Sequence, residues 1–146
     1  MFCRRGIRQS ARLMGVMPVS EVTLLLVEDN DDDRFLTLRI LKKLPFALQI
    51  EIAKNGDEAL QRLLAKNSAT PAVVLLDLQL PKIGGISLLA RVRASFSPAA
   101  LPVIILSSSD NPGDYKLCQE LGISGYLSKP LDPSALQKQL AALIPP

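Results

Sequence analysis

The stretch LLLVEDNDDD, residues 24–33, passes from four apolar residues directly into a run of acidic ones. A continuous apolar run of this length is typical of a strand that is buried on both faces of a sheet. Five of the six residues that follow are carboxylates, and their mutual repulsion destabilises a folded chain unless positive charge lies among them or a helix end uses them. The stretch therefore predicts a buried strand, an acidic site at its end, and a helix that starts next to the site.

Apolar runs and helical patterns alternate from residue 21 onward. Five strand–helix units in strict alternation predict an α/β fold, with a parallel sheet and helices on both faces, although periodicity does not give the strand order. We expect strands over 21–27, 47–53, 72–77, 102–108 and 124–129, and helices over 32–44, 55–67, 84–95, 112–122 and 132–144.

The first of these helices is predicted by apolar residues at three- and four-residue spacings, and Pro45 is expected to stop it. The spacing places one apolar stripe along the helix, made of Phe35, Leu36, Leu38, Ile40, Leu41 and Leu44.

Positive charge is concentrated in the first twenty residues, which contain Arg4, Arg5, Arg8, Arg12 and no acid. Without these four arginines the chain has 13 basic and 14 acidic residues. We expect residues 1–20 to be a disordered basic extension and residues 21–146 to form one domain. An organelle transit peptide, or a start of translation at Met17, is the alternative account of the extension.

The remainder of the chain has few features of a nucleic-acid or membrane protein. It has no basic stripe interleaved with aromatic residues, so we expect no binding to nucleic acid. No apolar run approaches the roughly 18 residues that a membrane span requires. Cys3 and Cys118 lie far apart without a supporting histidine, which favours two reduced thiols in a cytoplasmic protein.

Polar residues stand where the predicted strands end. Glu28 and Asp29 follow the first strand, Asp77 closes the third, Ser107 closes the fourth and Lys129 follows the fifth. In parallel α/β sheets, ligands bind beyond the carboxyl ends of the strands. We therefore expect three carboxylates, a hydroxyl and an ammonium group to lie together at one edge of the sheet.

This set of groups suits the binding of a phosphoryl group beside a metal ion. The carboxylates favour Mg²⁺ or Mn²⁺, which leave coordination positions open to phosphate oxygens. Lys129 and Ser107 can contact the other oxygens, and Asp77 is the natural nucleophile. We assign Glu28 and Asp29 to the metal, and the acids at 31–33 to the first turn of the following helix, where the macrodipole favours negative charge.

Four segments, in this order and at these spacings, resemble the receiver domain of two-component response regulators. They are LLLVEDN (24–30), VVLLDLQLPKIGG (73–85), VIILSSS (103–109) and GYLSKP (125–130). The resemblance implies a flavodoxin-like fold of five βα units with strand order 2-1-3-4-5.

The resemblance also implies roles for the residues at the strand ends. Asp77 matches the aspartate that accepts the phosphoryl group, and Lys129 the lysine beside it. Glu28 and Asp29 match the acidic pair around Mg²⁺, with the main-chain carbonyl of Gln79 as a further ligand. The peptide bond from Lys129 to Pro130 is expected to be cis.

Two further residues match the switch of the family. The Ser107 hydroxyl is expected to move to the phosphoryl group while the ring of Tyr126 turns into the vacated space. This change would reshape the face formed by the helix at 112–122, the strand at 124–129 and the helix at 132–144. Gln79 and Ser109 match positions at which side chains commonly tune dephosphorylation in this family, so the resemblance leaves the phosphoryl lifetime open.

The chain has no histidine, so the phosphoryl group is expected to come from a partner histidine kinase or phosphotransfer protein. We expect a single-domain receiver, of the chemotaxis-like or phytochrome-associated type, because only Pro145 and Pro146 follow the last helix. It would be no enzyme beyond self-catalysed phosphotransfer and slow autodephosphorylation, would signal to an unidentified protein, and would be a monomer or a phosphorylation-dependent homodimer. The alternative is a phosphatase of the haloacid dehalogenase type, which needs an acid at the position of Gln79.

Overall fold

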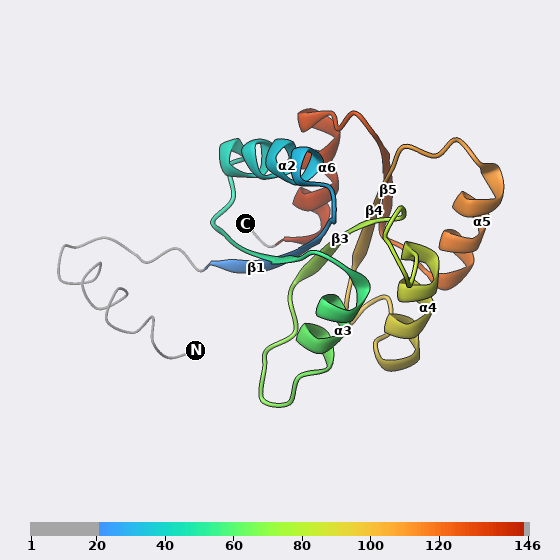
Figure 1. Ribbon diagram of the computed structural model, residues 1–146. Coiled ribbons are helices and arrows are strands. Elements are labelled where there is room, and N and C mark those ends of the chain that lie inside the picture. Colours follow the sequence, from blue (N-terminus) through green and yellow to red (C-terminus); the bar gives the residue numbers. More distant parts are fainter. Residues whose placement is uncertain (1–20, 145–146) are drawn as a thin grey trace.

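Five parallel strands form a single sheet in the order β2-β1-β3-β4-β5 (Figure 1). The computed structural model describes residues 21–144, so the expected extension over residues 1–20 lies outside the described residues. The strands are β1 (Val22–Val27), β2 (Leu48–Ala53), β3 (Val73–Asp77), β4 (Val103–Ser107) and β5 (Gly125–Ser128). The helices are α2 (Asp31–Lys43), α3 (Gly56–Leu64), α4 (Gly85–Ser95), α5 (Pro112–Leu121) and α6 (Pro133–Leu143).

The predicted fold class and strand order are confirmed, and helices cover both faces of the sheet. Helices α3, α4 and α5 lie on one face, while α2 and α6 lie on the other (Figure 1). Successive strand residues alternate between the two cores: Leu25 and Val27 belong to the first, Leu24 and Leu26 to the second. Burying each such side chain contributes about 1.5–3 kcal/mol, which explains why the continuous apolar runs became the central strands.

The apolar stripe expected on α2 is wrong in two positions. Thr37 and Leu41 are the buried residues of this helix, whereas Phe35 and Leu36 are 60% and 54% exposed. At 3.6 residues per turn, these two side chains point about 120–140° away from Leu41. The apolar residues of α2 therefore cover more of its circumference than the sheet can bury.

A close approach of two backbones fixes the start of α4 next to the end of β3. A Cβ added at Gly85 would lie 2.5 Å from Leu78 Cα and 2.7 Å from the carbonyl oxygen of Asp77. The Gly85 amide also donates to the carbonyl of Leu78 over 3.0 Å. Glycine is thus required at this position for steric reasons.

The ends of two helices follow the signals in the sequence, whereas α3 ends at Leu64 and not at residue 67 as expected. Asp132 caps α6, which has Pro133 in its first turn, and Gly122 ends α5 in the left-handed conformation at φ 87°. None of the helices within residues 21–144 is long and apolar enough to cross a membrane.

Arg93 joins the ends of α4 and α5. Its Nη2 donates to the carbonyl of Gly122 over 2.8 Å, and its Nη1 to that of Leu101 over 2.9 Å. Burial lowers the pKa of this guanidinium, yet its charge faces the negative ends of two helices. The backbone carbonyls that accept from Arg93 are those of Phe96, Ser97, Leu101, Leu121 and Gly122.

We expect Arg93→Met to lower the free energy of unfolding by about 2–3 kcal/mol, because several carbonyls lose a charged donor while the apolar stem is kept. Urea denaturation measures the change. Arg91→Met is the matched control, since Arg91 is exposed on the same helix and its loss should change stability by no more than about 0.5 kcal/mol. Equal effects of the two substitutions would contradict the role given to Arg93.

Candidate functional site

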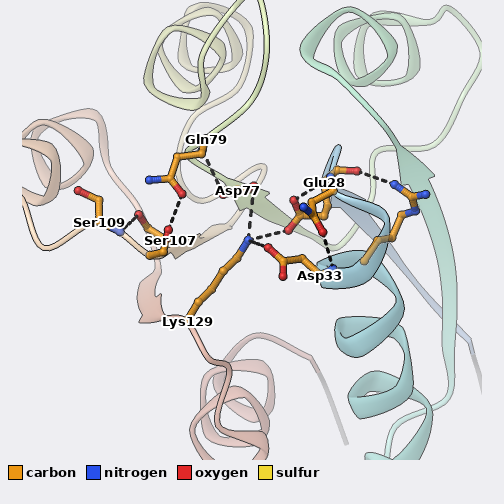
Figure 2. Close-up of polar contacts among 10 residues, drawn as sticks. Glu28, Asp33, Asp77, Gln79, Ser107, Ser109 and Lys129 are labelled. Atoms are coloured by element: carbon orange, nitrogen blue, oxygen red, sulfur yellow. Dashed lines mark hydrogen bonds and ion pairs between the residues drawn. The ribbon is translucent and has the colours of Figure 1, made fainter.

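The carboxyl ends of four strands meet at one edge of the sheet, and the residues expected there lie together (Figure 2). The parallel pairing aligns these ends, with Asp77 opposite Leu106 and Ser107 opposite Ser128. Glu28, Asp77 and Ser107 are buried polar residues at the ends of otherwise apolar strands. Buried polar groups require partners, so their contacts decide what the site can do.

Lys129 places a positive charge among the buried carboxylates. Its Nζ lies 2.8 Å from Glu28 Oε1, 2.9 Å from Asp33 Oδ2 and 3.4 Å from Asp77 Oδ2 (Figure 2). Burial alone lowers the pKa of Lys129, but the hydrogen bonds to Glu28 and Asp33 and the charge of Asp77 outweigh it and raise the pKa above its ordinary value. The ammonium group therefore stays charged and offsets part of the repulsion.

Three carboxylates are close enough to hold one metal ion. Oxygen atoms of Glu28, Asp29 and Asp77 all lie within 4.8 Å of one another, and Asp29 is the exposed member of the group. A set of carboxylate oxygens open to water on one side fits Mg²⁺ or Mn²⁺, which bind through a few carboxylates and keep several waters. The residues present thus fit the ion that the sequence predicts.

The protonation of Glu28 reflects how crowded this cluster is. Burial, a hydrogen bond with Asp77 and the charge of Asp77 raise the pKa of Glu28 from 4.5 to about 7, against the opposing effect of Lys129. One ammonium group is therefore too little to keep Glu28 fully ionised at neutral pH. A divalent cation would supply the missing positive charge.

The acids that follow Asp29 lie at the start of α2, as predicted. Asn30 caps the helix, and its side chain accepts from the amide of Asp33 over 2.9 Å. Asp31, Asp32 and Asp33 occupy the first turn. The sequence interpretation missed the second role of Asp33, whose carboxylate binds Lys129. Helical phase could have found it, because Asp33 is four residues before the buried Thr37.

The loops after β3 and β4 meet next to Asp77. The Gln79 amide donates to Asp77 Oδ1 over 3.1 Å, and Ser108 Oγ donates to Gln79 Oε1 over 2.6 Å. Ser107 Oγ accepts from the amide of Ser109 over 2.9 Å (Figure 2). The backbone of Gln79 therefore lies at Asp77, while a ligand role for its carbonyl stays a prediction.

Two further expectations concern β5 and the residues after it. The peptide bond from Lys129 to Pro130 is cis, as predicted. Tyr126 lies on β5, opposite Ile105 of β4, and is half-buried. Its ring contacts Tyr115 of α5, a contact that the sequence interpretation did not anticipate.

Comparisons with known proteins give a consistent result. A family model described as the response regulator receiver domain matches residues 24–141. The probable methanogenesis regulatory protein FilR2 of Methanothrix harundinacea is 35% identical over 111 residues, which cover 74% of this chain and 72% of FilR2. The response regulator Rcp1 of Synechocystis sp. is 34% identical over 110 residues, which cover 73% of this chain and 75% of Rcp1.

Solved structures agree with this similarity. The bacteriophytochrome response regulator AtBRR has a TM-score of 0.74 at 36% identity, covering 85% of this chain and 93% of that one. The Mn²⁺-bound form of Rcp1 has a TM-score of 0.69 at 31% identity, covering 83% of this chain and 90% of that one.

We expect Glu28 to make stability depend on pH in the absence of divalent cations. Its pKa is higher in the folded protein than in the unfolded chain, so the folded state binds more protons between pH 4.5 and about 7. Stability therefore falls as the pH rises through this window. Lys129 adds no slope there, because its raised pKa gives stability that is lost only at alkaline pH. Glu28→Gln should flatten the dependence.

Urea denaturation in EDTA at pH 5, 6, 7 and 8 measures this difference between variant and wild type. Glu120→Gln, an exposed substitution on α5, is the control and should keep the slope of the wild type. A Glu28→Gln variant with the full wild-type slope would show that another group is responsible.

Proposed function

Because the chain belongs to the response regulator receiver domain family of two-component systems, whose members are phosphorylated by histidine kinases, we propose that Asp77 accepts a phosphoryl group. The donor is a phosphohistidine of a partner kinase or phosphotransfer protein. One observation carries this proposal: Asp77 is buried at the end of a central strand, 3.4 Å from the Lys129 ammonium, and its carboxylate has an oxygen within 4.8 Å of oxygens of Glu28 and Asp29.

The reaction needs little besides position and charge. A carboxylate oxygen of Asp77 forms a bond to phosphorus as the bond from phosphorus to the donor imidazole breaks, and the electron pair of that bond stays on the imidazole nitrogen. The Lys129 ammonium contacts one phosphoryl oxygen, and the Ser107 hydroxyl donates to another after turning away from the Ser109 amide. The buried surroundings strengthen both contacts.

Glu28, Asp29, Asp77 and the main-chain carbonyl of Gln79 would hold Mg²⁺ in this reaction. When bound, the ion offsets the charge of the phosphoryl oxygens as they approach the carboxylates. Two observations support this ion class: the cluster offers only oxygen ligands, and the similar protein Rcp1 forms a Mn²⁺-bound state.

The phosphorylated state is signalled by contact with another protein, through the face made of α5, β5 and α6. Ser107 and Tyr126 are the switch residues. Tyr115 and Leu117 support this choice of face, because they are large apolar side chains of α5 that are about half exposed. We place the protein in the cytoplasm, as a monomer or a phosphorylation-dependent homodimer that binds no nucleic acid.

Incubation with Mg²⁺ and acetyl phosphate should add one acid-labile phosphoryl group, and Asp77→Asn should abolish this product because an amide cannot attack phosphorus. Mass spectrometry of the intact protein measures the added mass. Asp57→Asn, an exposed acid in the first turn of α3, is the control and should be phosphorylated like the wild type. Undiminished incorporation in Asp77→Asn would overturn the assignment, and steady turnover of phosphate esters would instead support a phosphatase.

Asp29→Asn should weaken Mg²⁺ binding at least about tenfold, because a ligand carboxylate is lost while the exposed site leaves folding intact. Isothermal titration calorimetry with MgCl₂ measures the affinity. Asp32→Asn is the matched control, since Asp32 is an exposed member of the same acidic run but lies in the first turn of α2. Equal weakening by both would mean that the run attracts the cation only by its total charge.

A further inference from the structure

The only two tyrosines of the chain contact each other. The ring centroids of Tyr115 and Tyr126 are 5.1 Å apart, and the ring planes are 80° to one another. This edge-to-face geometry is the favourable one for two aromatic rings. Gln119 orients Tyr115 further, because its Nε2 donates to the phenolic oxygen over 2.6 Å. Tyr115 lies on α5, and Tyr126, the proposed switch residue, lies on β5.

The residue before Tyr115 is connected to the other switch residue. Ser109 Oγ donates to Asp114 Oδ2 over 3.2 Å, while the Ser109 amide donates to Ser107 Oγ over 2.9 Å. Two adjacent residues at the start of α5 are therefore connected to the two switch residues. Asp114 reaches Ser107 through Ser109, and Tyr115 contacts Tyr126 directly.

Ser109 holds the Ser107 hydroxyl in this structure while the ring of Tyr126 contacts Tyr115. The Ser107 hydroxyl accepts from the Ser109 amide, and in the proposed switch it leaves this amide to donate to the phosphoryl group. The contact with Tyr115 therefore belongs to the position that the ring of Tyr126 has before the hydroxyl moves, and the ring would leave this contact when it turns into the vacated space.

We propose that Tyr115 is a positioning residue that holds the ring of Tyr126 in the position observed here and so opposes switching until Asp77 is phosphorylated. This inference rests on the proposed function, since it concerns the switch of the same site. An interaction made in only one of two states shifts the equilibrium between them by its full strength. Removing it lets a phosphoryl mimic bind more tightly, because less of its binding free energy is used to turn the ring.

Tyr115→Leu should therefore raise the affinity for beryllofluoride in the presence of Mg²⁺ by about two- to tenfold, the range expected for one aromatic pair. Tyr115→Phe keeps the ring contact and loses only the phenolic oxygen, so its affinity should stay close to that of the wild type. Lys116→Ala is the control for a truncated side chain on the exposed surface of α5 and should also have no effect. Unchanged or weaker binding by Tyr115→Leu would overturn the proposal.

NMR of the protein with labelled tyrosines reports directly on the contact between the two rings, because the chain has only two tyrosines. A merely structural role of Tyr115 would leave this contact unchanged when a phosphoryl mimic binds. Without ligand, the wild type should show cross-relaxation between the two rings, and saturation with Mg²⁺ and beryllofluoride should abolish it. Ring contacts that persist while ¹⁹F NMR shows bound beryllofluoride would refute the role of Tyr115 and leave the proposed function intact. Absence of any bound ¹⁹F signal would instead refute the proposed function, and with it this inference.

Discussion

The contact of one ammonium group with three carboxylates is the interaction on which the rest of the site depends. Lys129 connects β5 to the ends of β1 and β3 and to the first turn of α2 through Glu28, Asp77 and Asp33. Buried carboxylates without such a partner would cost several kcal/mol each. Yet one positive charge does not balance the cluster, as the pKa of Glu28 near 7 indicates. The folded chain therefore keeps a site of excess negative charge that favours a divalent cation.

The sheet makes this arrangement possible between residues that are far apart in the sequence. Lys129 and Glu28 are 101 residues apart, and only the parallel order β2-β1-β3-β4-β5 brings their strand ends to the same edge. The apolar strands supply the stability that a crowded, half-compensated acidic cluster removes. The start of α4 also lies close to this edge. Position 85 requires glycine because α4 starts directly against the backbone of Asp77.

Most of the fold could be predicted from the sequence, because its signals are local. Continuous apolar runs gave the strands, Pro45 and Gly122 gave helix ends, and the polar residues at the strand ends gave the candidate site. What escaped prediction depends on how a helix is rotated or on a contact between distant elements. The apolar residues of α2 do not reveal that Phe35 faces outward. Helical phase places Asp33 on the side of the buried Thr37, but no local signal identifies Lys129 as its partner. The roles of Arg93 and of the tyrosine pair likewise depend on elements that meet only in the folded chain.

The helices differ in how many residues they bury, and this difference supports the place of α5 in the proposed switch. Helix α4 buries Gly85, Leu88, Leu89 and Val92, whereas Cys118 is the one buried residue of α5. Strands β4 and β5 are fixed by parallel pairing. A movement of the Ser107 side chain is therefore easier to accommodate by a shift of α5 than by a shift of the sheet. The hydrogen bonds through Ser109 and the ring contact of Tyr115 both end on the first turn of this helix. Helix α5 has fewer buried residues than any other helix of residues 21–144, so in the proposed switch it is the helix that can shift with the smallest loss of packing.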